Sequence, residues 1–338
     1  MITDKQLKKA HDYDFREAEE LKDFTAVKGY DFSKPFDFKS FLKSFDTTGF
    51  QATNLGTAIK IIRKMREDRV KIILTYTSNL ITSGLRDVIA YLVKNKFVDV
   101  ICTTGGGIEE DIMKCKEPFI LGDFRADAKE LYDKGLNRTG NIYVSSTTYV
   151  ELEKFLMPIL DEFYQRQMKE NKIVNAPELI WEMGRKINDE SSILYWAEKN
   201  KIPVFCPAVT DGAIGDMVWF FKHKHPEFKI DIADDIFQMN NIPIETKETG
   251  VIALGAGMPR HYALNSNIFR GGAKYAVYVN SGNEWDGATY SSKPNEAYTW
   301  GKIKLLEPFE KNSVEVFGDA TIIFPLVVAG AFADFKVI

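Results

Sequence analysis

Cysteine is scarce in this chain of 338 residues, which contains only Cys102, Cys115 and Cys206. The three are widely spaced and form no CxxC pair, so we exclude a disulfide-stapled protein and expect reduced thiols. Long apolar runs are also missing. The longest, residues 321–332, contains Pro325 and falls short of the roughly 20 residues that a membrane-spanning helix needs. The N-terminal segment lacks the apolar core of a secretory signal. We therefore expect a soluble, cytoplasmic protein.

An excess of positive charge is absent as well. The chain has 44 Lys and Arg against 48 Asp and Glu, a net charge of −4, so nucleic acid is not an expected partner. The sequence shows no internal repeat, no HExxH, no Walker A motif, no GxSxG and no cluster of Cys and His. We therefore predict no metal site, no nucleotide triphosphatase and no serine hydrolase.

What the sequence does contain is a regular alternation of two apolar patterns. Short runs rich in β-branched residues are separated by longer segments of helical period, such as residues 85–94 and 178–199. We expect strands at residues 70–76, 98–103, 141–144, 203–209, 250–254, 275–279 and 314–317. This pattern predicts an α/β fold in which helices cover both faces of a parallel sheet. Because the first fifty residues lack it, we predict an N-terminal extension (1–50) packed on a core domain (51–338).

Small and hydroxylated residues follow most of the predicted strands. The carboxyl ends of parallel strands share one edge of a sheet, where open α/β sheets bind ligands, so we expect one crevice to collect these loops. They are Thr77-Ser78-Asn79, Thr103-Thr104-Gly105-Gly106-Gly107, Thr210-Asp211-Gly212, Gly255-Ala256-Gly257, Asn280-Ser281-Gly282 and Gly318-Asp319-Ala320.

The most unusual of these loops is followed directly by three acids, Glu109, Glu110 and Asp111. Its glycines allow a close approach of the backbone to a phosphate at a helix start, but carboxylates there compete with the phosphate for the positive helix end. A carboxylate could instead accept a hydrogen bond from a ribose hydroxyl or pair with a substrate ammonium. The structural alternative is a tight turn whose acids cap the helix.

Two further loops carry titratable side chains. The stretch GAGMPRH, residues 255–261, is an incomplete dinucleotide fingerprint, because its third glycine is missing and Pro259 stands where the helix would open. His261 is either a base that acts near neutral pH or a structural histidine. Asp211 and Asp216 flank small residues, and helix capping accounts for one of them.

Aromatic residues, carboxylates and one lysine gather between the last two predicted strands, in residues 285–289 and 296–302. This combination suits an organic polycation, through cation–π attraction and charge pairing. A lysine that is desolvated beside an indole or lies near other cations can have a lowered pKa, as a Schiff-base nucleophile requires. Lys302 is therefore either such a nucleophile or a surface lysine.

Four of these stretches together resemble deoxyhypusine synthase: residues 77–81, 103–111, 207–216 and 296–303. They occur in the family's order, and the similarity runs from about Gly29 to Ala331. The resemblance implies a Rossmann-like sheet with NAD bound at the carboxyl ends of the strands. It also implies a transferase that moves the aminobutyl group of spermidine, through an imine on an enzyme lysine, to one lysine of the translation factor 5A precursor.

The resemblance further implies roles for individual residues. Lys302 would carry the imine, and His261 would take a proton from spermidine. The NAD-binding positions would be Ser78, Asn79, Thr82, Thr104, Gly105, Gly106, Glu110, Asp211, Ser281, Gly282, Asp319 and Ala320. The spermidine pocket would comprise Glu109, Asp216, Gly287, Thr289, Glu296 and Trp300.

Two positions depart from the family pattern. Thr289 stands where members commonly carry an aspartate, and Arg260 stands where lysine is frequent. These departures leave open a homospermidine synthase-type reaction with putrescine or another small amine as acceptor, and a binding protein without turnover is a further alternative. The resemblance also implies a homotetramer, a dimer of dimers with active sites shared across the dimer interface, and an N-terminal segment that can cover the site entrance.

Overall fold

The computed structural model describes residues 2–15, 21–308 and 311–333. Its strands are β1 (Lys71–Thr75), β2 (Val100–Cys102), β3 (Ile120–Leu121), β4 (Leu136–Thr139), β5 (Ile142–Ser145), β6 (Val174–Asn175), β7 (Val204–Phe205), β8 (Ile230–Asp231), β9 (Thr249–Leu254), β10 (Tyr275–Asn280) and β11 (Ser313–Phe317). Its helices are α1 (Asp4–Asp14), α2 (Phe38–Thr48), α3 (Phe50–Glu67), α4 (Ser78–Thr82), α5 (Leu85–Lys94), α6 (Gly105–Lys114), α7 (Ala128–Asp133), α8 (Thr147–Glu170), α9 (Ala176–Ile187), α10 (Ile193–Asn200), α11 (Ala213–Lys224), α12 (Ile232–Glu245), α13 (Met258–Ser266), α14 (Pro294–Thr299) and α15 (Ala320–Ala331), with short 3-10 turns at Ile268–Arg270 and Thr289–Ser291.

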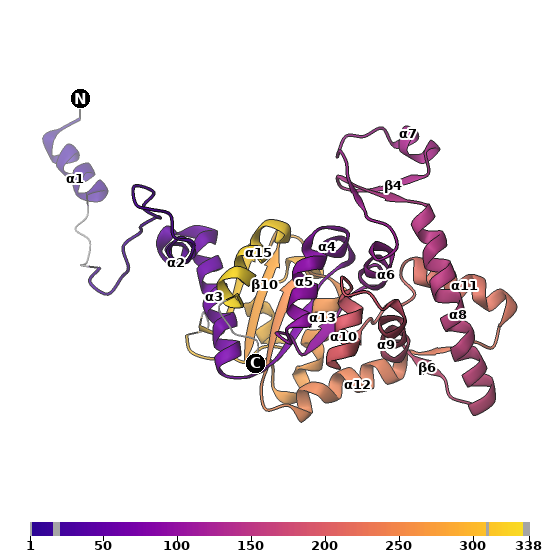
Figure 1. The fold of residues 1–338 in the computed structure, drawn as a ribbon. Coiled ribbons are helices and arrows are strands. Elements are labelled where there is room, and N and C mark those ends of the chain that lie inside the picture. Colours follow the sequence, from indigo (N-terminus) through magenta and orange to yellow (C-terminus); the bar gives the residue numbers. More distant parts are fainter. Residues whose placement is uncertain (1, 16–20, 309–310, 334–338) are drawn as a thin grey trace.

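The central sheet confirms the predicted parallel α/β fold (Figure 1). Its strands lie in the order β11-β10-β9-β1-β2-β7, and every neighbouring pair is parallel. Read from β7, this is the order 3-2-1-4-5-6 of the doubly wound dinucleotide-binding fold. The order reverses between β1 and β9, so the ligand crevice of such a sheet lies at the loops that follow these two strands.

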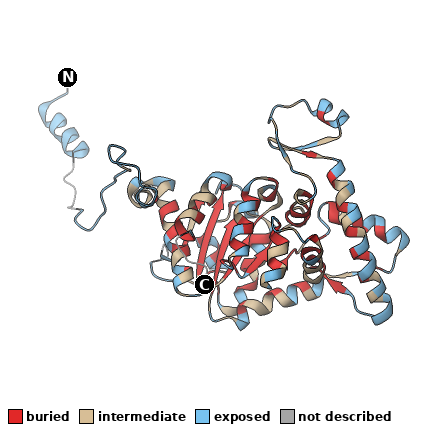
Figure 2. Ribbon diagram, in the orientation of Figure 1, coloured by how far each residue is buried: buried red, intermediate tan, exposed pale blue. Residues whose placement is uncertain are grey.

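Helices cover both faces of the sheet, and alternate residues of a strand point into different cores. Ile72 and Leu74 of β1 belong to the larger core, with residues of α3, α5 and α15. Ile73 belongs to a smaller core with residues of α12, α13 and α14. Figure 2 shows the strands as the most continuously buried part of the molecule. Burial on both faces explains why the strands were recognisable as short, nearly unbroken apolar runs.

Three expectations about elements were wrong in detail. Residues 141–144 do not join the main sheet, because Gly140, with φ 59°, allows a hairpin in which β5 pairs antiparallel with β4 and β3. The expected helix over residues 178–199 is two helices, since Asn188 takes the left-handed conformation that ends α9. The strand expected at 203–209 is shorter, ending at Phe205.

The N-terminal region reaches away from the sheet (Figure 1). α1 has no buried residue, whereas α2 packs against α3 and buries Leu42. α3 begins at Phe50, and the division of the chain at residue 50 stays a prediction. Within the described ranges, none of the helices combines the length and apolar character that a membrane crossing requires.

Candidate active site

The first group of predicted nucleotide residues lies where α4 and α6 meet, after β1 and β2. α4 carries Ser78 and Thr82, and the Thr82 hydroxyl donates to Glu110 Oε2 over 2.5 Å. A Cβ atom added to Gly106 would lie 2.5 Å from that of Ser78, so glycine permits the close approach of the two helices. The structure therefore brings these predicted positions together, although they are about thirty residues apart in the chain.

α6 also contacts the loop that precedes α11. A Cβ atom on Gly105 would lie 1.9 Å from the carbonyl oxygen of Asp211. Glu109 Oε2 accepts a hydrogen bond of 2.9 Å from the backbone N–H of Ile214, in the first turn of α11. The N-cap of α11 is Gly212, which has no side chain for this purpose. The expectation that one of the two aspartates, Asp211 or Asp216, caps this helix was therefore wrong, because Glu109 of α6 accepts from a backbone N–H group of its first turn instead.

The three acids of α6 have three different partners. Glu109 faces α11 and Glu110 faces α4, while Asp111 accepts from Arg86 Nε over 2.7 Å and from Ser192 Oγ over 2.6 Å. Burial raises the pKa of Glu110 to about 7 and raises that of Glu109 above its ordinary value. These acids do not cap their own helix, and its N-cap residue, Thr104, makes no side-chain cap either. The first backbone N–H groups of α6 are thus without side-chain caps, as phosphate binding at a helix start requires.

His261 and Lys302 come together in a cavity. α13 begins directly after β9 and carries His261, and Lys302 follows α14. Lys302 Nζ lies 3.5 Å from His261 Nδ1 and 5.8 Å from the centre of the Trp300 ring. This cavity of about 550 Å³ is lined by these three residues and also by Arg260, Leu264, Asn265, Ile268, Glu284, Asp286, Gly287, Ala288, Thr289, Ser291, Ser292, Glu296 and Ala297.

Asn265 is a member of this cavity that the sequence reasoning missed. Its Nδ2 lies 2.9 Å from His261 Nε2, so the amide holds the imidazole from the side opposite to Lys302. The two residues are four apart on α13 and therefore share one helix face. The spacing of four residues could have indicated that Asn265 lies beside His261. It indicates a site residue, however, only once His261 is known to line a cavity.

Positive charge and burial act together on the pKa values of Lys302 and His261. Burial and the nearby Arg260 guanidinium lower the pKa of the Lys302 ammonium. Burial, followed by Lys302 and Arg260, lowers the pKa of His261. Arg260 is only 2% exposed, lies 4.8 Å from the centre of the Tyr278 ring and donates to the carbonyl oxygen of Thr289. This buried guanidinium thus favours neutral side chains at both sites.

The remaining predicted nucleotide residues follow β10 and β11, which are neighbours in the sheet. Asp319 caps α15, its Oδ1 accepting from the backbone N–H of Thr321 over 2.7 Å. The backbone N–H of Gly318 donates to the Asn280 carbonyl oxygen over 2.8 Å, so the loops that hold Ser281-Gly282 and Asp319-Ala320 lie side by side.

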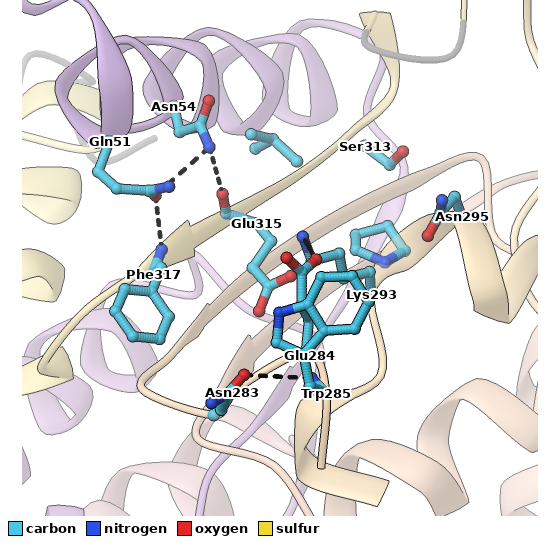
Figure 3. A pocket seen from close by; sticks show the side chains of 13 residues that line it. Gln51, Asn54, Asn283, Glu284, Trp285, Lys293, Asn295, Ser313, Glu315 and Phe317 are labelled. Atoms are coloured by element: carbon cyan, nitrogen blue, oxygen red, sulfur yellow. Dashed lines mark hydrogen bonds and ion pairs between the residues drawn. The ribbon is translucent and has the colours of Figure 1, made fainter. Parts of the chain in front are cut away.

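Another cavity, of about 800 Å³, runs along β11 and is shown in Figure 3. Gly282, Trp285 and Glu315 line it, and Glu315 extends toward Trp285 and Glu284. Glu284 also lines the Lys302 cavity, so it stands between the two spaces. Neither Glu284 nor Glu315 was predicted from the sequence. Glu284 lies in the loop after β10 and Glu315 lies on β11, and only the fold brings these two segments together.

Two predicted spermidine residues are not with the others. Glu109 and Asp216 do not line the Lys302 cavity. They belong to α6 and α11, and α11 lies well away from β10 (Figure 1). Within one chain, the predicted spermidine residues therefore form two groups.

Comparisons with known proteins identify the family of this chain. A family model described as deoxyhypusine synthase matches residues 40–331. A "Probable deoxyhypusine synthase" from Methanocaldococcus jannaschii is 47% identical over 83% of this chain and 88% of its own length. A "Deoxyhypusine synthase" from Musa acuminata is 44% identical over 93% and 89%. A crystal structure titled as a "putative deoxyhypusine synthase" from Entamoeba histolytica has a TM-score of 0.62 at 32% identity, covering 92% of this chain and 99% of that one. The chain belongs to the deoxyhypusine synthase family.

Proposed function

We propose that this chain transfers the aminobutyl group of spermidine to a lysine of the translation factor 5A precursor, with NAD as cofactor, and so forms deoxyhypusine. The observation that carries the proposal is the pair of Lys302 and His261, 3.5 Å apart in a cavity that Trp300 and Glu296 also line. A lysine with a lowered pKa beside an imidazole is what imine formation on an enzyme needs. Family membership supports the same reaction, and none of the relatives named above points to transfer to putrescine instead.

The residues around α6 fit NAD. The strand order reverses beside β1, where such sheets bind their ligands, Gly105 and Gly106 lie where larger residues would clash, and the start of α6 has no side-chain cap. The carboxylates of Glu110 and Asp211 could accept hydrogen bonds from ribose hydroxyls. When bound, NAD would take a hydride from the carbon next to a spermidine nitrogen and later return it.

The chain's own side chains would do the remaining work. His261, kept neutral by its lowered pKa, accepts a proton from the amine. Neutral Lys302 then bonds through Nζ to the aminobutyl carbon, and propane-1,3-diamine leaves. The Trp300 indole and the Glu296 carboxylate hold the cationic chain of the substrate. The acceptor lysine displaces Lys302 in the last transfer.

The proposal includes a second copy of the chain. Glu109 and Asp216 do not line the cavity of Lys302 in their own chain. We therefore place them in the site of a neighbouring subunit, within a cytoplasmic homotetramer whose dimers share their active sites. A substrate with several ammonium groups then meets carboxylates from both subunits.

Trapping of the covalent intermediate tests this function. The enzyme is incubated with NAD and spermidine, reduced with borohydride and analysed by mass spectrometry. We expect an aminobutyl adduct on Lys302 that is absent from Lys302→Ala. Lys304→Ala is the matched control, because Lys304 pairs with Glu248 over 2.9 Å and does not line the cavity. An adduct-free wild-type enzyme that still binds NAD would refute the proposal. Product analysis with the 5A precursor and with putrescine then identifies the acceptor.

A further inference from the structure

Lys114 is a half-buried lysine on α6 that has no part in the proposed chemistry. Its Nζ donates to three successive backbone carbonyl oxygens, those of Ile81 (2.7 Å), Thr82 (2.7 Å) and Ser83 (2.9 Å). An ammonium group has three donors, so these bonds use all of them. Lys114 thus binds the carboxyl end of α4, which no sequence pattern had indicated.

α4 needs such external support, because it is only five residues long. A helix of that length is unstable on its own, and the last carbonyl groups of any helix lack partners within it. A cation at this end is also favoured by the helix dipole. The ammonium group of Lys114 meets both needs at once.

Lys114 is the third member of a row of residues along α6. Gly106, Glu110 and Lys114 are spaced four apart and therefore share one face of the helix. Gly106 meets Ser78, Glu110 accepts from Thr82, and Lys114 closes the far end of α4. α4 is thereby fixed to α6 along its whole length. The first two members of the row are predicted nucleotide positions, and the third continues the same contact.

We propose that Lys114 is a positioning residue for nucleotide binding, which fixes α4 so that Ser78, Asn79 and Thr82 keep their places in the site. This inference rests on the proposed function, because NAD is the ligand that these residues would bind. Lys114 itself need not touch the nucleotide. Because Lys114 already holds α4 in place in the ligand-free protein, α4 loses less conformational entropy when the ligand binds.

The test compares Lys114→Met, which keeps the apolar stem and loses the ammonium group, with the wild type. By calorimetry we expect the Kd for NAD to rise about tenfold. KM for NAD should rise in the same way, whereas kcat at saturating NAD should change little. In the ligand-free protein, hydrogen exchange should become faster at residues 78–84 and stay unchanged in β9 and β10. A general loss of structure would instead speed exchange everywhere.

Lys94→Met is the matched control. Lys94 also ends a helix, but its Nζ lies on the surface, 3.6 Å from Glu190 Oε2. We expect this variant to bind NAD like the wild type. Lys114→Arg keeps the charge and several donors, so it should recover part of the affinity. If Lys114→Met does not fold, Lys114→Gln takes its place with the same expectations.

The outcomes separate this inference from the proposed function. A folded Lys114→Met that binds NAD as tightly as the wild type, with unchanged exchange at residues 78–84, overturns the inference alone. A wild-type protein that does not bind NAD overturns the proposed function and the inference together. Weaker NAD binding by Lys114→Met, with faster exchange confined to α4, supports the inference.

Discussion

At the scale of single residues, the site depends on positive charges held close together. Arg260 is almost completely buried, lies against Tyr278 and donates to the carbonyl oxygen of Thr289. Its guanidinium group does not lose its charge at working pH. Its effect on Lys302 is therefore constant, which makes it a good subject for a test by pH.

We expect Arg260→Met to move the pH dependence of imine formation to higher pH. A neighbouring positive charge disfavours protonated lysine and lowers its pKa, so loss of Arg260 should raise the pKa of Lys302. In the proposed reaction the neutral amine is the nucleophile, so the rising limb of the rate profile should follow that pKa. The measurement is the rate of borohydride-trapped adduct formation from about pH 6 to 11, a range that includes the ordinary lysine pKa of about 10.4. Arg260→Lys retains a positive charge while its ammonium group is protonated, so its profile should lie closer to that of the wild type than the Arg260→Met profile does. Superimposable profiles for Arg260→Met and wild type would contradict the view that Arg260 lowers the pKa of Lys302.

At the scale of secondary-structure elements, the site is a meeting of short segments from distant parts of the chain. α6 approaches the loop before α11 so closely that Gly105 has no space for a methyl group, its added Cβ lying 1.9 Å from the backbone oxygen of Asp211. Because that oxygen belongs to the backbone, no side-chain rotation can relieve the clash. The glycines of the loop are thus required by packing between elements, and this packing also shapes the start of α6.

We expect Gly105→Ala to push α6 away from this loop and to weaken NAD binding by about fivefold or more, because overpacking of a tight contact costs roughly 1–3 kcal/mol. Gly84→Ala is the matched control. Gly84 has open space around its Cβ position and φ −70°, so alanine should change the free energy of unfolding by no more than about 0.5 kcal/mol. Calorimetry with NAD and urea unfolding measure the two effects. Equal NAD affinities for both variants would show that this contact does not shape the site.

Much of this arrangement was predictable because it depends on local patterns. The apolar runs indicated the sheet, and the small residues after them indicated its binding edge. The partners of Glu109, Glu110 and Asp111 were not predictable, since they lie on α11, on α4, on α5 and at the N-cap of α10. Side-chain contacts between distant elements leave no trace in the spacing of one sequence. The hairpin of β4 and β5 was missed for a different reason: a short apolar strand looks the same in a parallel or an antiparallel sheet.

At the scale of the whole molecule, the two groups of predicted spermidine residues need an explanation. Asp216 lies in the first turn of α11, next to Trp219 and Phe220, which are 59% and 52% exposed. Large aromatic side chains exposed together are typical of surfaces that bind another protein. A second copy of the chain seated on α11 would cover them and bring the Lys302 cavity of one subunit toward Asp216 of the other.

Mixing of two inactive variants tests whether the active site is shared between subunits. Lys302→Ala and Asp216→Asn are each expected to be inactive. In a mixed dimer, however, one of the two sites would combine the intact Lys302 of one chain with the intact Asp216 of the other. Half of the dimers are mixed after random assembly from equal amounts, so about a quarter of the wild-type activity should return.

The control for this experiment mixes Lys302→Ala with His261→Ala. Both residues line the same cavity of one chain, so every site in such a mixture lacks one of them and activity should stay absent. Co-refolding, followed by light scattering to establish that oligomers have formed, prepares both samples. If oligomers form and Lys302→Ala with Asp216→Asn remains inactive, the two groups do not meet across an interface. Asp216 would then have to act outside the spermidine site, because its own chain does not place it in the Lys302 cavity.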